Sequence, residues 1–138
     1  MLEKIDLSKT VDKERYKMVR DEVGARLGVL QRECKAAGIP VIIVFEGMGA
    51  AGKGVQINRL IQNLDPRGFS VYASSRPTED EEMRPFLWRY WIKTPANGRI
   101  AIFDRSWYCR VQRDRFDGKI DEGDVAGAFQ DILSFEKQ

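Results

Sequence analysis

The sequence predicts an α/β fold with a parallel sheet, and three observations support this prediction. Strand patterns alternate with helical patterns along the chain, as in proteins whose parallel strands are joined by helices. The first strand pattern, residues 41–45, is an unbroken apolar run, which predicts a fully buried parallel strand. A glycine-rich segment follows this run and leads into an amphipathic helix. We therefore expect right-handed crossovers that place helices on both faces of the sheet.

Composition and charge limit the classes of protein to which the chain can belong. The 138 residues correspond to one domain at most, and 43% hydrophobic with 32% charged residues is typical of a soluble globular chain. A net charge of +2 gives no overall basic field, which argues against a nucleic acid polymer as partner. The chain has no histidine, and Cys34 and Cys109 are far apart, so neither a zinc site nor a disulfide framework is predicted. We expect a cytoplasmic protein with no membrane segment.

The helices expected outside the glycine-rich region are set by caps and apolar spacing. Residues 1–11 are expected to form an irregular arm, and residues 12–138 one partial domain. Asp12 is a candidate cap of a long helix that ends near Ala37. One face of that helix is apolar and is expected to pack on the core; it comprises Tyr16, Val19, Val23, Leu27, Leu30 and Cys34.

The rest of the chain adds two strand patterns and two helical ones. Alternating residues predict a strand over 69–74, and an apolar run predicts another over 99–104. Thr78 and Glu81 form a capping box that opens a helix, which Pro85 should kink or restart. A last amphipathic helix is expected over residues 124–137.

The glycine-rich segment has the spacing G-x-x-x-x-G-K between a strand and a helix, which predicts a phosphate-binding loop. Its backbone N–H groups and the positive end of the following helix would face the phosphates, and Lys53 would add a point charge. An ordinary glycine-rich βα turn is the alternative. The candidate binding residues are Gly47, Met48, Gly49, Ala50, Ala51, Gly52, Lys53 and Gly54. Gly54 stands where such loops usually carry a Ser or Thr that holds Mg²⁺.

A carboxylate at the end of a later strand is the candidate metal ligand. Asp104 ends the strand over 99–104, and an Asp in that place downstream of a phosphate loop commonly holds Mg²⁺. A turn or helix cap is the alternative role for it. Because parallel strands present their carboxyl ends at one edge, we expect Asp104 and Arg105 to converge with the loop.

Two further segments have two possible roles each. Residues 86–91 are rich in aromatic side chains, and this segment either packs on the sheet or binds a nucleotide base or phosphate with Arg84 and Arg89. Arg110, Arg113 and Arg115 form a basic run that either faces solvent or contacts a polyanion.

Three strands are fewer than the roughly five of a P-loop kinase core, which has a parallel sheet in a three-layer α/β/α arrangement. The sequence therefore predicts an incomplete domain of this class, without its last strands and lid. A strand left unpaired on one side would favour association with another copy, so we expect a homo-oligomer.

Four motifs in order resemble the polyphosphate kinase 2 family over roughly residues 12–137. They are E-G-x-x-A-A-G-K-G from Glu46, D-P-R-G from Asp65, P-F-L-W-R-Y-W from Pro85 and F-D-R-S-W-Y from Phe103. The chain looks most like the first half of the double-domain polyphosphate:AMP phosphotransferases. The resemblance implies Mg²⁺-dependent transfer of a phosphoryl group between inorganic polyphosphate and a nucleotide, with AMP to ADP favoured.

The resemblance also assigns roles to individual residues. It implies that Lys53 binds the transferring phosphates, Asp104 holds Mg²⁺ and Arg105 neutralises phosphate oxygens, so that these three are the candidate catalytic residues. Arg89 is a candidate nucleotide or phosphate ligand. The family's loop usually carries an Asp where this chain has Gly49. Two other functions stay open: a catalytically degenerate partner domain that binds polyphosphate, and a nucleoside monophosphate kinase that uses ATP.

Overall fold

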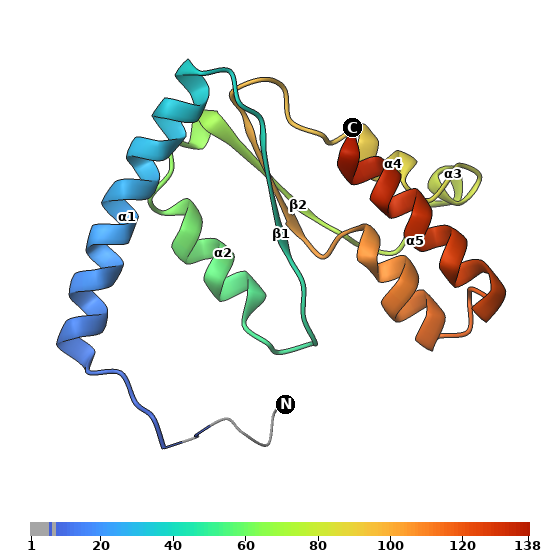
Figure 1. Ribbon diagram of the computed structural model, residues 1–138, viewed down its shortest axis with the longest axis horizontal. Helices are drawn as coiled ribbons and strands as arrows, with labels where there is room; N and C mark the ends of the chain where they lie inside the picture. The colour runs from blue at the N-terminus through green and yellow to red at the C-terminus, as the bar shows by residue number, and fades with distance from the viewer. Residues whose placement is uncertain (1–5, 7) are drawn as a thin grey trace.

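The computed structural model describes residue 6 and residues 8–138, and contains a parallel three-stranded sheet in the order β1-β3-β2 (Figure 1). Strand β1 spans Val41–Phe45, β2 spans Phe69–Ala73 and β3 spans Ile100–Asp104. The predicted α/β fold with a parallel sheet and few strands is confirmed. The predicted ranges 69–74 and 99–104 extend slightly beyond the observed strands.

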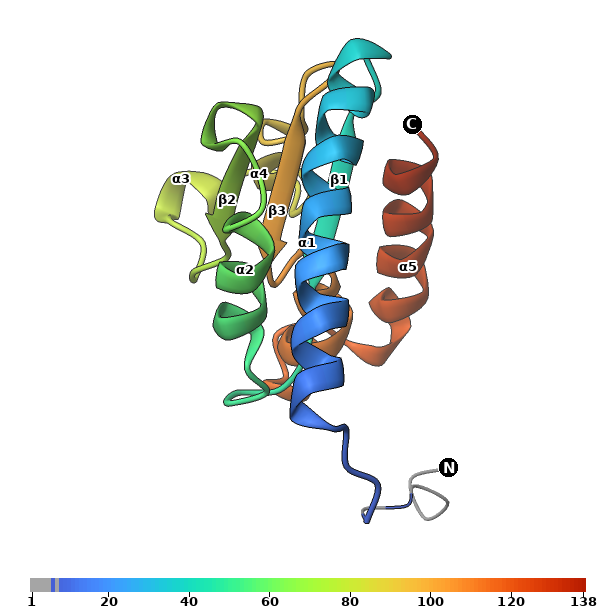
Figure 2. The ribbon, with the colours of Figure 1, turned by 90° about the vertical axis from the view of Figure 1, so that its left-hand side faces the viewer.

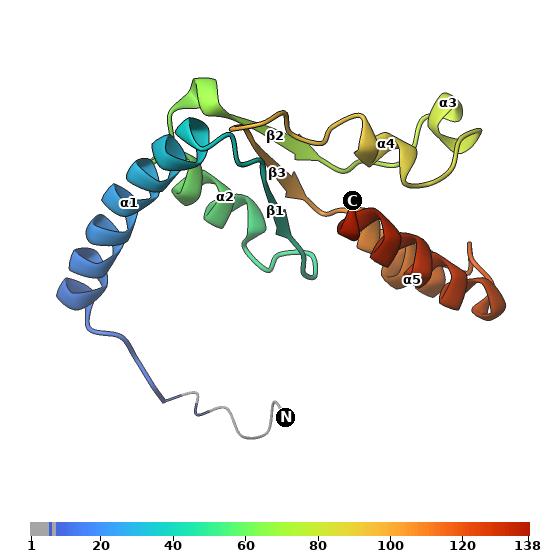
Figure 3. The same ribbon diagram turned by 45° about the horizontal axis from the view of Figure 1, so that its top comes forward.

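Helices cover both faces of the sheet, as the alternating pattern predicts. Helices α1 (Lys13–Ala36) and α2 (Lys53–Ile61) lie on one side, and α3 (Glu79–Glu82), α4 (Trp88–Trp91) and α5 (Glu122–Lys137) lie on the other (Figure 3). In Figure 2, α1 lies in front of β1, and α5 lies to the right of both. No helix of the described residues is long and apolar enough to cross a membrane.

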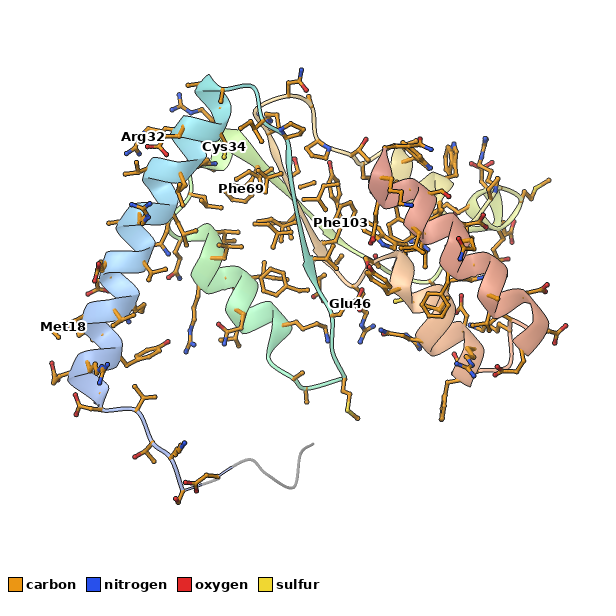
Figure 4. The ribbon with its side chains drawn as sticks, in the orientation of Figure 1. Met18, Arg32, Cys34, Glu46, Phe69 and Phe103 are labelled. Carbon is orange, nitrogen blue, oxygen red and sulfur yellow. The ribbon has the colours of Figure 1, made fainter. Side chains whose placement is uncertain are left out.

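The central strand β3 divides the core between the two layers. Its side chains alternate between the faces, so Ile100 and Ile102 pack with Ile57 of α2, whereas Phe103 packs with residues of the α4–α5 side such as Ile132. Phe103 is labelled in Figure 4. All residues from Ile100 to Phe103 are buried. The apolar residues of β3, and not those of β1, are therefore buried on both faces of the sheet.

The prediction that residues 41–45 form a fully buried strand is wrong. β1 is at an edge of the sheet, most of its residues are only partly buried, and Ile42 is 42% exposed. An apolar run indicates a strand that can be buried on both faces, but it does not reveal the position of that strand in the sheet.

The prediction for the apolar face of α1 is also wrong in large part. Tyr16, Val19, Val23 and Leu30 are exposed. A neighbouring face of the helix contacts the end of the segment after α2, where a Cβ on Gly24 would strike the side chain of Asn63. On the same face, the Gln31 amide exchanges two hydrogen bonds with the backbone of Asp65. Small and polar residues let α1 approach closely. Leu27 of the predicted apolar face packs against the core, whereas the four exposed residues lie beside the contact.

The helix ends follow the predicted signals more closely. The Asp12 side chain accepts a hydrogen bond from the N–H of Arg15 at 2.9 Å, and Thr78 and Glu81 form the capping box. The helix that begins after Thr78 ends before Pro85 and a new one starts at Trp88, so the proline restarts the helix. The last helix begins two residues before the predicted start. Residues 1–5 and 7 of the predicted arm lie outside the described residues, and residues 6 and 8–11 form no helix or strand.

Candidate phosphate-binding site

The loop between β1 and α2 has an unusual backbone. Gly47 and Gly52 adopt φ angles of 142° and 84°, which an L side chain rarely adopts. Ala50 also has a positive φ, 61°, which is uncommon and costly for a residue with a Cβ. Gly52 precedes the first turn of α2, where the N–H groups have no intrahelical partners. The glycines of the predicted motif therefore occur where the backbone needs them.

Lys53 lies over this loop. Its Nζ donates hydrogen bonds to the carbonyl oxygens of Gly47 at 2.8 Å and Met48 at 2.9 Å. The ammonium group is thus close to the loop N–H groups and to the start of α2. Positive charge, helix N-terminus and loop amides together form a site suited to anions.

The strand register places Asp104 beside this loop. Phe45, the last residue of β1, pairs with Asp104 of β3. A hollow of about 470 Å³ lies at this end of the sheet. Its lining comprises residues 49–55, Ala73, Ser74, Asp104 and Arg105. The structure therefore brings Lys53, Asp104 and Arg105 together, as the sequence predicts, whereas Gly47 and Met48 do not line the hollow.

Arg105 stands in a strained conformation at the edge of the hollow. Its φ is 63°, and its N–H donates to the carbonyl of Phe45 at 2.9 Å. The hydroxyl of Ser74 donates to the Arg105 carbonyl at 2.8 Å. Sequence analysis missed Ser74, which follows β2 directly. The signal that could have found it is the edge rule for parallel strands, but the rule needs the strand order, with β3 between β1 and β2.

A second hollow, of about 630 Å³, adjoins the first, since Ser74 and Arg105 line both. Many of its side chains are cationic; they are Arg76, Arg84, Arg89, Arg105, Arg110, Arg113 and Lys119. Glu81, Glu82 and Asp114 add carboxylates, and Phe86 adds an aromatic ring. The guanidinium of Arg84 lies 4.3 Å from the ring centroid of Trp88, a cation–π contact.

The predicted basic run divides between this hollow and its surroundings. Arg110 and Arg113 line the hollow, although Asp114 and Asp117 lie 3.7 Å and 3.6 Å from them in ion pairs. Arg115 does not line it and forms an ion pair with Glu122 at 2.6 Å. The alternative of a solvated face therefore holds for Arg115, whereas the other two can reach a ligand.

Arg89 lies in the second hollow and not in the hollow of the loop. It is only 8% exposed, and its Nη2 lies 3.4 Å from Oε2 of Glu81. Its Nε is buried without a hydrogen-bond partner among the described residues. An unpaired buried donor costs free energy that a bound anion would recover. The role of Arg89 as a substrate ligand stays a prediction.

Two titratable side chains near the arginines are held neutral. Burial raises the pKa of the Tyr90 hydroxyl, and burial, with the nearby Glu46 carboxylate, raises the pKa of the Cys109 thiol. Tyr90 and Cys109 both line the second hollow. Because neither forms an anion near neutral pH, neither repels a phosphate there.

The oxygen donors present suit Mg²⁺, but they are few. Among the described residues there is no group of three or more His, Cys, Asp or Glu side chains placed to hold a metal. Asp104 is the carboxylate that lines the hollow of the loop, and Gly49 and Gly54 offer no side-chain oxygen. Mg²⁺ tolerates this arrangement, since it keeps several waters and takes its other ligands from substrate phosphates.

Comparisons with known proteins show the family to which the chain belongs. The chain is 41% identical over all its 138 residues to a polyphosphate:AMP phosphotransferase of Pseudomonas syringae pv. tomato, and 40% identical to one of Pseudomonas aeruginosa. It spans 28% of the length of each. A crystal structure of a polyphosphate kinase 2 from Arthrobacter aurescens superimposes with a TM-score of 0.89 at 30% identity, over 99% of this chain and 52% of that one. The polyphosphate kinase 2 family matches residues 10–138, and the chain belongs to that family.

Proposed function

We propose that the chain binds inorganic polyphosphate and a nucleotide and takes part in Mg²⁺-dependent phosphoryl transfer between them, with AMP to ADP favoured. The observation that carries the proposal is the shared hollow of Lys53, Asp104 and Arg105. The names of the two Pseudomonas relatives support the choice of polyphosphate and AMP. The strand–loop–helix motif supports the phosphate-binding role of the loop.

In this proposal the protein positions the substrates and stabilises charge. Lys53 and the loop N–H groups would hold the phosphate that is transferred, and Lys53 would exchange its carbonyl partners for phosphate oxygens. Arg105 would balance the charge that spreads over the phosphoryl oxygens during in-line displacement. Little covalent chemistry is required of the side chains.

The second hollow would take the other substrate. The attacking oxygen of the acceptor must come within about 3–3.5 Å of the phosphorus that is transferred, so the sites of the two substrates have to adjoin. Arg105 and Ser74 line both hollows and mark this boundary. Arg84 and Arg89 would contact the phosphate of that substrate, and the aromatic ring of Phe86 offers a stacking surface.

Asp104 would hold Mg²⁺, with phosphate oxygens and water as the remaining ligands. The cation would neutralise phosphate charge during the transfer. The missing side-chain oxygens at Gly49 and Gly54 favour a second candidate: a partner domain that binds polyphosphate without turning it over. A nucleoside monophosphate kinase that uses ATP would share the same loop.

One donor-exchange experiment separates these functions. The protein is incubated with AMP, Mg²⁺ and either polyphosphate or ATP as the sole donor, and ADP is quantified. If the proposal is right, ADP forms when polyphosphate is the donor and not when ATP is. The rate of ADP formation should fall at least about tenfold in Asp104→Asn. ADP from ATP alone would favour the monophosphate kinase. Polyphosphate binding without ADP from either donor would favour the partner domain.

A further inference from the structure

Glu46 occupies a position that the proposed function does not yet explain. It lies between β1 and the phosphate loop, at the end of the strand near the segment that follows β3 (Figure 4). Its Oε1 accepts a hydrogen bond from the N–H of Ser106 at 2.8 Å and another from the Ser106 hydroxyl at 2.6 Å. Ser106 is fully buried. One carboxylate oxygen therefore joins the start of the loop to a residue 60 positions later in the chain.

The backbone N–H and carbonyl groups of Ser106 and of its neighbour Arg105 all form hydrogen bonds. The Tyr90 hydroxyl donates to the Ser106 carbonyl at 3.0 Å. The N–H of Arg105 donates to Phe45, and the Arg105 carbonyl accepts from Ser74. Together with the two bonds to Glu46, these contacts engage the backbone N–H and carbonyl of both Arg105 and Ser106. The segment has no unbonded backbone group that would let it rotate freely.

This bonding matters because Arg105 is strained. A positive φ at a residue with a Cβ persists when the surrounding contacts fix it on both sides. Phe45 and Ser74 fix Arg105 itself, and Glu46 and Tyr90 fix the next residue. Loss of the Glu46 contacts would leave Ser106 with two unpaired donors in a buried place and would let Arg105 relax.

We propose that Glu46 is a positioning residue, which acts through Ser106 to hold Arg105 at the boundary between the two hollows. The function of Arg105 in this inference rests on the proposed function. Two hydrogen-bond donors shield the carboxylate oxygen that faces Ser106, which lessens its repulsion of phosphates nearby. An amide oxygen can accept the same two bonds, so Glu46→Gln should keep the geometry, whereas Glu46→Ala cannot.

The test is a double-mutant cycle between Glu46 and Arg105, with tripolyphosphate as the probe and calorimetric titration as the measurement. We expect Glu46→Ala to raise the Kd about tenfold, and Glu46→Gln to change it by less than about twofold. In an Arg105→Ala background, Glu46→Ala should add no further loss, because its effect passes through Arg105. Glu22→Ala, which removes an exposed carboxylate of α1, serves as the matched control.

Equal losses from Glu46→Ala in both backgrounds would overturn the proposal, as would an unchanged Kd. Hydrogen exchange of the Arg105 amide gives a readout that needs no ligand. That amide is bonded to Phe45, and Glu46→Ala should raise its exchange rate about tenfold; unchanged protection would refute the positioning role. If the wild-type protein does not bind tripolyphosphate, the proposed function fails and the exchange rates still decide the role of Glu46. If Glu46→Ala does not fold, Ser106→Ala removes one of the two bonds and should shift both readouts in the same direction.

Discussion

The Nζ atom of Lys53 lies 2.8 Å from the carbonyl oxygen of Gly47, six residues earlier in the chain. A second hydrogen bond reaches the carbonyl of Met48 at 2.9 Å. Both acceptors belong to the loop that would bind phosphate. A phosphate in the loop would offer this ammonium group charged acceptors, which form stronger hydrogen bonds with it than neutral carbonyl oxygens do.

Removal of this ammonium should weaken anion binding strongly. We expect Lys53→Ala to raise the Kd for tripolyphosphate by about 10- to 100-fold, since a hydrogen bond to a charged group contributes about 1.5–3 kcal/mol. Calorimetric titration measures the change. Lys17→Ala, which removes an exposed cation of α1, is the control and should have little effect. A similar loss in both variants would mean that only the overall charge matters.

A carboxylate at Gly49 should couple phosphate binding to Mg²⁺. A Cβ at Gly49 would meet no atom within 4 Å, and its backbone needs no positive φ, so Gly49→Asp should fit. Without Mg²⁺ the added negative charge should weaken tripolyphosphate binding; with Mg²⁺ it should strengthen binding. We expect the ratio of the two Kd values to rise fivefold or more relative to the wild type.

The control for that variant is Gly123→Asp, which adds the same charge on α5, where a Cβ also meets nothing within 4 Å. Titrations with and without Mg²⁺ are compared for both variants. If Gly123→Asp changes the ratio of the two Kd values as much as Gly49→Asp does, the effect does not depend on a carboxylate in the loop. If neither changes it, Mg²⁺ does not bind beside the loop.

Local patterns predicted the parts of the site that depend on neighbours in sequence. The spacing from Gly47 to Lys53 needs only a strand before it and a helix after it, and both are present. Asp104 could be placed beside the loop because the carboxyl ends of parallel strands share one edge. The site therefore followed from one motif and one rule of sheet geometry.

Features that depend on distant neighbours could not be predicted in this way. The buried side of α1 is decided by Gln31, whose polar side chain is buried because it bonds to Asp65, 34 residues away. Apolar periodicity cannot indicate such a contact, so the predicted face was wrong. Likewise, Ser74 joins the site only because β3 lies between β1 and β2, and strand order is not visible in the sequence.

The fit between α1 and the loop before β3 should not tolerate a side chain at Gly98. Gly98 has a φ of 72°, and a Cβ there would lie 3.0 Å from the backbone of Lys35. We expect Gly98→Ala to lower the free energy of unfolding by about 1–3 kcal/mol. Gly127→Ala, at a helical position of α5 with open space around it, should instead raise that free energy by up to about 1 kcal/mol. Urea denaturation compares the two, and equal effects would contradict this packing.

Asp65, whose carboxylate caps the short 3-10 turn Pro66–Gly68 before β2, should make stability depend on pH in acid. The Arg67 guanidinium and N–H bond to Asp65 and lower the pKa of its carboxyl from about 3.8 to about 2. Because the folded pKa is the lower one, the contribution is present above pH 4 and is lost as the pH falls from about 4 to about 2. Asp65→Asn should therefore have a lower denaturation midpoint than the wild type at pH 6, and the difference should shrink as the pH falls through that window. A constant difference would show that the charge of Asp65 adds nothing.

The edge strand β1 should promote association between copies of this chain. Among the described residues β1 pairs with β3 alone, which leaves its other edge without a strand, and Ile42 is 42% exposed on it. Exposed edges with apolar side chains favour pairing with another chain, whereas a lysine opposes it. We expect light scattering to show a molar mass that rises with concentration, and Ile42→Lys to reduce this rise. Val71→Lys on β2, the other edge strand, is the matched control, because Val71 is about equally exposed. A stronger effect of Val71→Lys would mean that the copies associate through β2. A molar mass that stays at the monomer value at all concentrations would refute the predicted association.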